Sequence, residues 1–256
     1  MEKLRDRIKI LGSNLDPLTM EETISRVEDL INSKTYNQHV VINASKINLM
    51  HEDKQLMDIV NDCPLINADG QSIVWAGKLL GYNIPERVAG IDLFLKLVEL
   101  CNIKGYKPYF FGAKQEVIEK VVKMFSEKYP NLNIAGYRNG YFKDSESEQI
   151  AEDIKKSGAD MLFVAFSSPK KEIWIKKYQP IMQVPFAMGV GGSFDVVTGV
   201  TMRAPQWMQK YGLEWFYRFI QEPRRMGKRY LVGNIKFLAK VIKEGIFNES
   251  TNGRTK

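Results

Sequence analysis

Short and nearly continuous runs of apolar residues recur along the first 200 positions, separated by polar turns and longer amphipathic segments. Runs of this kind, without alternation, are typical of parallel strands that are buried on both faces of a sheet. The pattern predicts strands at 39–43, 64–67, 108–111, 132–135, 161–166 and 185–190.

Between these runs the apolar residues follow a helical period. The pattern predicts helices at 19–33, 53–61, 71–80, 91–104, 114–129, 146–157 and 169–178. Regular alternation of strand and helix is the signature of a doubly wound α/β fold. We therefore expect residues 1–200 to form a Rossmann-like, mostly parallel sheet with flanking helices.

From residue 201 the pattern changes, and aromatic residues interleave with arginines. At about 100° per residue, an apolar face of one helix collects Leu231, Ile235, Leu238 and Ile242. The roughly opposite, basic face collects Arg225, Arg229, Lys236, Lys240 and Lys243. A basic amphipathic helix is typical of a membrane surface; the alternative is a helix packed on the sheet with its charged face in solvent. We predict a basic helical appendage at 201–247 and a disordered tail at 248–256.

Charge is concentrated in this appendage. Residues 203–243 hold ten Lys or Arg but only two acids, for a net charge of +8, whereas the whole chain carries +7. The rest of the chain is therefore nearly neutral. Such asymmetry indicates an anionic partner for the C-terminal segment, namely nucleic acid, anionic lipid or phosphate.

The remaining composition narrows the class of protein. With 256 residues and 44% hydrophobic composition, the chain is long enough for one large α/β domain and an appendage. The charged N-terminus does not resemble a signal peptide, and no apolar run approaches the ~20 residues of a membrane span. Two cysteines without metal-ligand spacing suit a reducing cytoplasm, and two histidines make a His-rich metal site implausible.

The stretch around Asp69 carries the most specific chemical signal. An apolar run ends at Asp69, Gly70 follows, and a helical pattern then begins. Ligands of open parallel sheets bind at the carboxyl ends of the strands, so Asp69 stands where a general base would be placed. Alone, the aspartate is better explained as the N-cap of the next helix.

Two glycine-rich stretches also follow predicted strands. They are FFGAK at 110–114 and GVGGSFD at 189–195. Small residues there let backbone N–H groups approach a phosphate, although an ordinary tight turn has the same composition. Neither stretch fits G-x-G-x-x-G, because Phe194 takes the third glycine position, which weighs against a Rossmann dehydrogenase.

The order of motifs resembles the WecG/TagA/CpsF-type glycosyltransferases (glycosyltransferase family 26). The matching motifs are NADGQS at 67–72, PERVAGID at 85–92, FGAK at 111–114, GYF at 140–142, SPKKE at 168–172, GVGGSFD at 189–195, RAPQWM at 203–208 and GLEWFYRFIQEPRR at 212–225. This resemblance implies an inverting transfer of a sugar from a UDP-sugar to a polyprenyl-diphosphate-linked sugar in teichoic acid, capsule or exopolysaccharide synthesis. Donors used in the family include N-acetylmannosamine, glucose, galactose and glucuronic acid.

The resemblance also implies residue roles. Asp69 matches the catalytic base, Asn43 a polar active-site position and Arg87 the arginine that contacts the reacting groups. Arg218 and Arg225 match tail arginines that close over the diphosphate. Further substrate-binding positions are Asn67, Gln71, Gly112, Lys114, Tyr141, Lys171, Gly191, Gly192 and Asp195. Lys171 replaces a common glutamine, and Val41 replaces a threonine found in some members.

The chemistry expected of such a transfer agrees with the composition. The departing diphosphate needs positive charge, and the chain contains no Asp-x-Asp that would hold a metal for this purpose. Arg87 and the basic appendage would supply that charge instead. We therefore predict no cofactor and no metal, no nucleic-acid partner, and a cytoplasmic enzyme held peripherally on the inner face of the membrane; self-association is left open.

Two other classes compete with this interpretation. A basic nucleic-acid-binding α/β protein would explain the appendage but not Asp69, Arg87 and the glycine-rich strand ends. A nucleotide-dependent oxidoreductase would explain the glycines but lacks the dinucleotide fingerprint.

Overall fold

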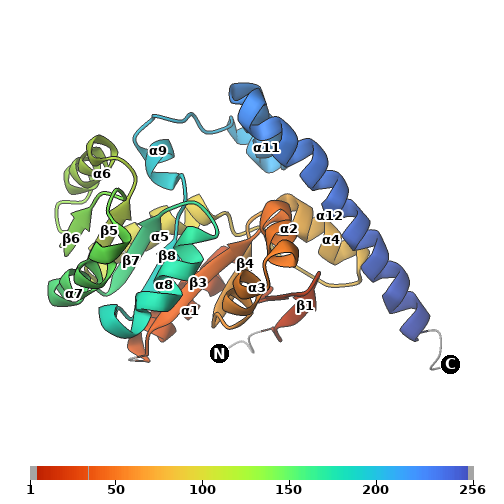
Figure 1. Cartoon of the computed structure of the whole chain (residues 1–256), viewed down its shortest axis with the longest axis horizontal. Helices are drawn as coiled ribbons and strands as arrows, with labels where there is room; N and C mark the ends of the chain where they lie inside the picture. The colour runs from red at the N-terminus through yellow and green to blue at the C-terminus, as the bar shows by residue number, and fades with distance from the viewer. Residues whose placement is uncertain (1–4, 34, 253–256) are drawn as a thin grey trace.

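A six-stranded parallel sheet forms the centre of the computed structural model, which describes residues 5–33 and 35–252 (Figure 1). The strand order is β4-β3-β8-β7-β5-β6. The strands are β3 (Asn37–Ile42), β4 (Leu65–Ala68), β5 (Pro108–Gly112), β6 (Gly136–Arg138), β7 (Met161–Ala165) and β8 (Phe186–Gly189). An antiparallel hairpin, β1 (Ile8–Ile10) and β2 (Ser13–Leu15), lies beside β4. The predicted parallel α/β fold is confirmed.

Helices cover both faces of the sheet. One face carries α1 (Met20–Asn32), α5 (Gly90–Lys104), α6 (Gln115–Lys128) and the short α9 (Ser193–Val197). The other carries α2 (Ala44–Glu52), α3 (Lys54–Asn61), α4 (Gln71–Leu79), α7 (Ser147–Ser157) and α8 (Lys170–Met182). The C-terminal segment adds α10 (Gln206–Lys210), α11 (Glu214–Gln221) and α12 (Pro223–Asn252).

Alternation along each strand explains why the runs are apolar throughout. Successive side chains of a strand point to opposite faces. Phe110 packs into the core under α5 and α6, whereas its neighbour Phe111 packs under α7 and α8. Both faces are thus dry, and a continuous apolar run is required for a central strand.

Two parts of the predicted pattern differ from the structure. The strand expected at 132–135 is wrong, because β6 begins at Gly136. Leu132 and Ile134 instead pack from a loop against the core, while the edge strand that follows exposes Tyr137. Helix α2, which follows β3 directly, was not predicted.

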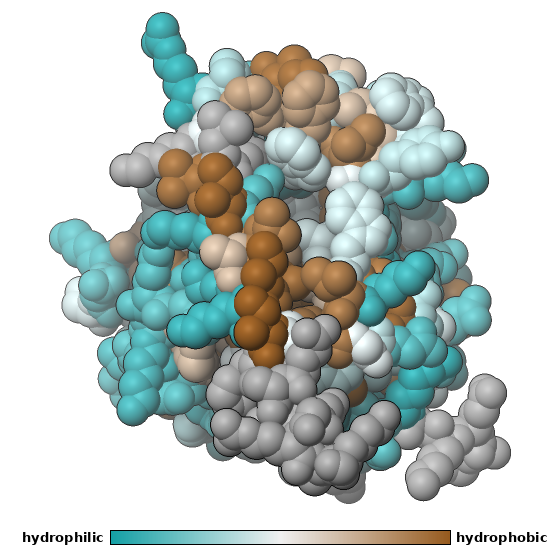
Figure 2. All heavy atoms as spheres, turned by 90° about the vertical axis from the view of Figure 1, so that its right-hand side faces the viewer, coloured by the Kyte–Doolittle hydropathy of each residue, from teal (hydrophilic) through white to brown (hydrophobic). Residues whose placement is uncertain are grey.

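Helix α12 packs along one side of the molecule against α2 (Figure 1). Phe237 and Val241 are buried at 7% and 3% exposure and join the core beneath α2. The predicted apolar face points the other way: Ile235 and Leu238 are 72% and 55% exposed, and Ile242 is also exposed. Figure 2 shows apolar side chains gathered over this side of the molecule. The helix therefore has two apolar sides, and one of them is uncovered.

The proposed division at residue 200 does not mark a gap in packing, because the segment beyond it shares the core of residues 1–200. Helix α12 continues to Asn252 and so includes the first residues of the tail expected at 248–256; residues 253–256 lie outside the described part of the chain. No helix within the described residues is both long and apolar enough to cross a membrane.

Candidate active site

The carboxyl ends of β3 and β4 place Asn43 and Asp69 side by side. Ile42 of β3 is in register with Ala68 of β4, so the next residue of each strand leaves the sheet at the same level. The Asp69 N–H donates to the Ile42 carbonyl at 2.9 Å. The Asn43 amide nitrogen donates to Asp69 Oδ2 at 3.4 Å, while Asn43 Oδ1 caps α2 by accepting from the Lys46 N–H.

Asp69 is not the cap of the helix that follows it. The N-cap of α4 is Gly70, which makes no side-chain capping bond. Asp69 Oδ1 instead accepts from the backbone N–H of Gly90 at 3.0 Å, at the start of α5. The carboxylate is thus aimed across the strand ends and held from two sides, by Asn43 and by Gly90. This orientation excludes the capping explanation and suits a general base.

Arg87 lies in the loop before α5 and is held by the C-terminal segment. Its Nη1 donates to Glu214 Oε2 at 2.5 Å. The other oxygen of Glu214 accepts from Arg203 Nε at 3.3 Å. Arg203 in turn makes two bonds to the Asp92 carboxylate at 2.6 and 2.7 Å, and these bonds raise the pKa of Arg203. Two arginines and two carboxylates therefore join the C-terminal segment to the first turn of α5.

The same segment also rests on the first turn of α4. A Cβ added to Gly212, whose φ is +71°, would lie 2.7 Å from the Cβ of Gln71. Any larger residue at 212 would push the segment off the helix. Gln71, predicted to bind substrate, is therefore covered by this turn and lies two residues after Asp69 in sequence.

Glycines at and after the end of β8 lie against a lysine of α8. A Cβ on Gly189 would lie 2.5 Å from Cδ of Lys171, so the lysine stem runs across this strand end. A Cβ added to Gly191 would lie 3.7 Å from Lys171 Nζ. A Cβ added to Gly192 would lie 3.9 Å from the Asp195 carboxylate. The predicted residues Lys171, Gly191, Gly192 and Asp195 thus lie close together at the end of β8, two strands away from β4.

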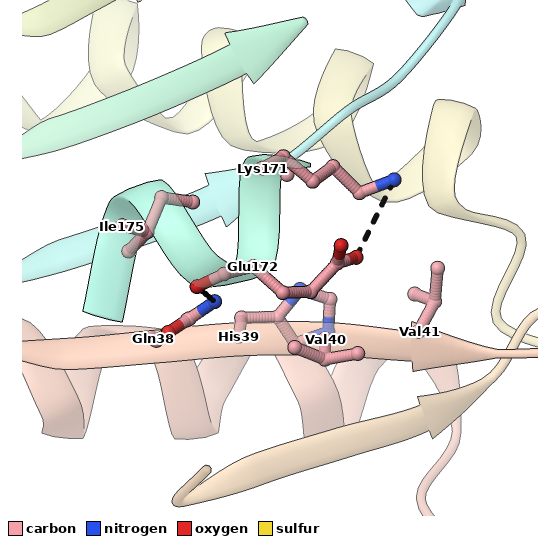
Figure 3. A pocket seen from close by; sticks show the side chains of 8 residues that line it. Gln38, His39, Val40, Val41, Lys171, Glu172 and Ile175 are labelled. Atoms are coloured by element: carbon pink, nitrogen blue, oxygen red, sulfur yellow. Dashed lines mark hydrogen bonds and ion pairs between the residues drawn. The ribbon is translucent and has the colours of Figure 1, made fainter. Parts of the chain in front are cut away.

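Beneath this turn lies a buried ion pair. Lys46 of α2 contacts Glu172 of α8, and Ser168 Oγ bridges them with two bonds of 3.0 Å. Burial lowers the pKa of Lys46 to about 8. Burial would raise the pKa of Glu172, but the ammonium groups of Lys46 and Lys171 outweigh it and hold that pKa below its usual value. Figure 3 shows Lys171 and Glu172 extending from α8 above β3, with a dashed line between their charged ends. Lys171 Nζ lies 3.6 Å from Glu172 Oε1.

Asn67 does not face this edge of the sheet. Its side chain is fully buried, and its amide bonds His39 Nε2 at 2.9 Å and Thr23 Oγ1 at 3.0 Å. Burial lowers the pKa of His39 to about 4, so the ring is neutral and its Nε2–H donates to Asn67 Oδ1. The structure therefore gives Asn67 an internal bonding role in place of the predicted contact with substrate.

Gly112, Lys114 and Tyr141 gather at the far end of the same edge. Gly112 has a φ of +124° and its Cβ would lie 2.8 Å from the Ala165 carbonyl, so close strand packing explains this glycine. Lys114 and Tyr141 are exposed. Four inter-strand steps separate β4 from β5, which corresponds to roughly 19 Å. These residues are therefore too distant to contact the same atoms as Asp69.

The tail arginines complete the predicted set. Arg218 is exposed on α11 and forms no ion pair with any residue that the structure describes. Arg225 lies on α12, but its side chain falls outside the described part of the structure. Within the described residues, no group of three His, Cys, Asp or Glu side chains is placed to hold a metal ion.

Comparison with known proteins identifies the family to which the chain belongs. Residues 8–251 match the Glycosyl transferase WecG/TagA/CpsF family. The chain belongs to this family. It is therefore a glycosyltransferase, which decides against the nucleic-acid-binding module and the oxidoreductase.

Relatives of this WecG/TagA/CpsF glycosyltransferase include two bacterial enzymes of the same name. The chain is 36% identical over 193 residues to the N-acetylglucosaminyldiphosphoundecaprenol N-acetyl-beta-D-mannosaminyltransferase of Bacillus subtilis (strain 168), covering 75% of this chain and 74% of the relative. It is 29% identical over 224 residues to the enzyme of that name from Staphylococcus aureus (strain MW2), covering 87% of each.

Sequence reasoning on this glycosyltransferase missed Glu214, Asp92 and the Lys46–Glu172 pair. Glu214 and Asp92 lie in quoted motifs, and Arg203 begins one, but no spacing in the chain shows that they meet. From the sequence Lys46 looks like an exposed helical lysine, but in the structure it is buried against Glu172 of α8.

Proposed function

We propose that this enzyme transfers an N-acetyl-β-D-mannosaminyl group from its UDP-activated form to N-acetylglucosaminyldiphosphoundecaprenol, with inversion. The names of the relatives support this choice of sugar and acceptor. The observation that carries the reaction is the placement of Asp69, whose carboxylate is held by Asn43 and Gly90 at the edge where a parallel sheet binds its ligands.

In this proposal Asp69 removes the proton from the acceptor hydroxyl as that oxygen attacks C1 of the sugar. The C1–O bond to UDP breaks on the opposite face, and UDP leaves with the bonding electrons. The Arg87 guanidinium, in the loop just before α5, would balance the charge that develops on the diphosphate. Lys171 of α8, whose side chain runs across the end of β8, is a second cation for the nucleotide.

We further propose that α12 holds the enzyme on the cytoplasmic membrane surface, where the acceptor lipid resides. The exposed side chains of Ile235, Leu238 and Ile242 would enter the interface. Exposed basic residues of the same helix, such as Lys243, would be attracted to anionic lipid. This arrangement would bring the strand ends to the lipid headgroups without a spanning segment.

A donor panel tests the proposed reaction. Purified enzyme is incubated with a short-chain N-acetylglucosaminyl diphospholipid and, in turn, UDP-N-acetylmannosamine, UDP-glucose, UDP-galactose and UDP-glucuronic acid. We expect product with UDP-N-acetylmannosamine alone. Turnover with another donor would show that the enzyme transfers a different sugar from the one proposed. The absence of any turnover would overturn the proposed function.

A further inference from the structure

Glu214 is a carboxylate placed between two arginines, one of which the proposed reaction needs. One of its oxygens accepts from Arg87 and the other from Arg203. Its side chain is 22% exposed and that of Arg87 is 17% exposed, so the pair is partly shielded from solvent. Partial burial makes such a charge-assisted bond stronger than one at the surface.

Glu214 uses only part of the Arg87 guanidinium. A guanidinium carries five N–H donors in a fixed fork. Among the described residues the structure gives Arg87 one bond, from Nη1 to Glu214. The remaining donors are therefore available to a diphosphate while Nη1 stays with the carboxylate.

The position of Glu214 ties this contact to the fold of the C-terminal segment. It is the first residue of α11 and lies two residues after Gly212, which rests against Gln71. Arg203 anchors the start of the segment to Asp92 through two short bonds. The carboxylate is therefore delivered to Arg87 only when the segment is docked.

We infer that Glu214 is a positioning residue, which fixes the Arg87 guanidinium for the leaving diphosphate and makes turnover depend on docking of the C-terminal segment. This inference rests on the proposed function, and specifically on the role of Arg87 there. The competing possibility is that Glu214 blocks the site by occupying Arg87, in which case the diphosphate must displace it.

Three variants and one double variant separate these possibilities. Glu214→Ala should lower kcat by roughly 10- to 100-fold, the range expected when a reacting group loses its alignment. Its Kd for UDP, measured by calorimetry, should change less than about threefold, because Arg87 remains present. Glu214→Gln keeps an oxygen acceptor and the side-chain shape, so it should recover most of the loss. In an Arg87→Ala background, Glu214→Ala should have no further effect on kcat.

Asp92→Asn provides a matched control for docking alone. It weakens the bond from Arg203 but leaves Arg87 and Glu214 paired. Its effect on kcat should therefore be smaller than that of Glu214→Ala. Thermal unfolding of each variant checks that the fold is retained.

Three results would overturn the inference. Tighter UDP binding and faster turnover in Glu214→Ala would show that the carboxylate is a competitor. An equal loss with and without Arg87 would show that Glu214 serves docking only, and wild-type kcat in Glu214→Ala would show that it serves neither. If the wild-type enzyme itself transfers no sugar, the proposed function fails, which is a separate outcome.

Discussion

The strand-end centre and the C-terminal segment are held in different ways. At the centre, Asp69 and Asn43 are oriented by bonds to backbone groups, the N–H groups of Gly90 and Lys46. The C-terminal segment shares the core through Phe237 and Val241, but it reaches the site through side-chain ion pairs at partly exposed positions, Arg87 with Glu214 and Arg203 with Asp92. Backbone groups cannot move without unfolding strands or helices, whereas ion pairs exchange partners and respond to salt.

This difference separates a fixed part of the site from a part that assembles. Asp69, the proposed base, is held by Asn43 at the end of β3 and by the first backbone N–H of α5. Arg87, proposed to stabilise the leaving group, is held by a segment that also carries an uncovered apolar face. Five predictions sharpen or break this division.

The largest effect is expected at the fixed centre. Asp69→Asn keeps the side-chain shape and its contacts but removes the basicity. Turnover should fall by about 10²–10⁴-fold, while calorimetry should still detect UDP binding. Near-wild-type turnover would show that Asp69 is not the general base, and the ends of β3 and β4 would no longer be the proposed catalytic centre.

Two adjacent residues of α12 test its two sides. Phe237→Ala should lower the free energy of unfolding by about 3 kcal/mol, because it leaves a cavity under α2. Leu238→Ala is the matched control, since this side chain is exposed; it should change stability by less than about 0.5 kcal/mol. Only Leu238→Ala should weaken binding to anionic liposomes without unfolding the protein. Equal stability losses would mean that both sides of α12 are packed.

Acid should destabilise the core through His39. Its pKa is about 4 in the fold and about 6.5 when unfolded, so the unfolded chain binds more protons between these values. Stability contributed by the neutral ring is complete above pH 6.5 and is lost as the pH falls toward 4, to a total of about 3 kcal/mol. His39→Gln, which does not titrate, should lose that much less between pH 7 and 4 in urea denaturation. Parallel losses in both proteins would contradict the assignment.

A smaller effect is expected from a single tail arginine. Arg218→Ala should reduce turnover by about tenfold. It should weaken liposome binding by less than about fivefold, because one basic residue near a surface contributes about 1 kcal/mol. Lys243→Ala, also exposed, should weaken liposome binding similarly and leave turnover unchanged. Equal turnover in the two variants would show that Arg218 contributes only to membrane binding and not to the reaction.

No effect is expected from metal removal. Arg87, Lys171 and the tail arginines supply positive charge in the proposed reaction, so activity should survive incubation with EDTA. Complete loss that Mg²⁺ or Mn²⁺ restores would show that a metal stabilises the diphosphate. In that case the arginines of the C-terminal segment would not be the main source of positive charge for the leaving diphosphate.

The sequence predicted the sheet well because its strands are buried on both faces and read as unbroken apolar runs. It failed at β6, since an edge strand with an exposed Tyr137 has no such run, and the nearby apolar residues belong to a loop. Helix α2 was missed because it follows β3 with no intervening turn and contains polar residues such as Lys46, which is buried only through its partner on α8.

The candidate site was predictable where local sequence decides it. The strand-end location of Asp69 follows from an apolar run that stops at a carboxylate. Its bond to Gly90 and the contact of Arg87 with Glu214 join residues 21 and 127 positions apart. Such contacts depend on how helices are placed on the sheet, which residue types and spacing do not specify.

The hairpin beside β4 has a consequence for self-association. Asp16, just after β2, donates its N–H to the Ile66 carbonyl at 2.8 Å and accepts from the Ile66 N–H at 2.7 Å through its carboxylate. One residue thus occupies both hydrogen-bonding groups in the middle of an edge strand. A strand from another copy would have to displace it before the two sheets could join. At this edge, copies of the enzyme can meet through their side chains but cannot extend one another's sheet.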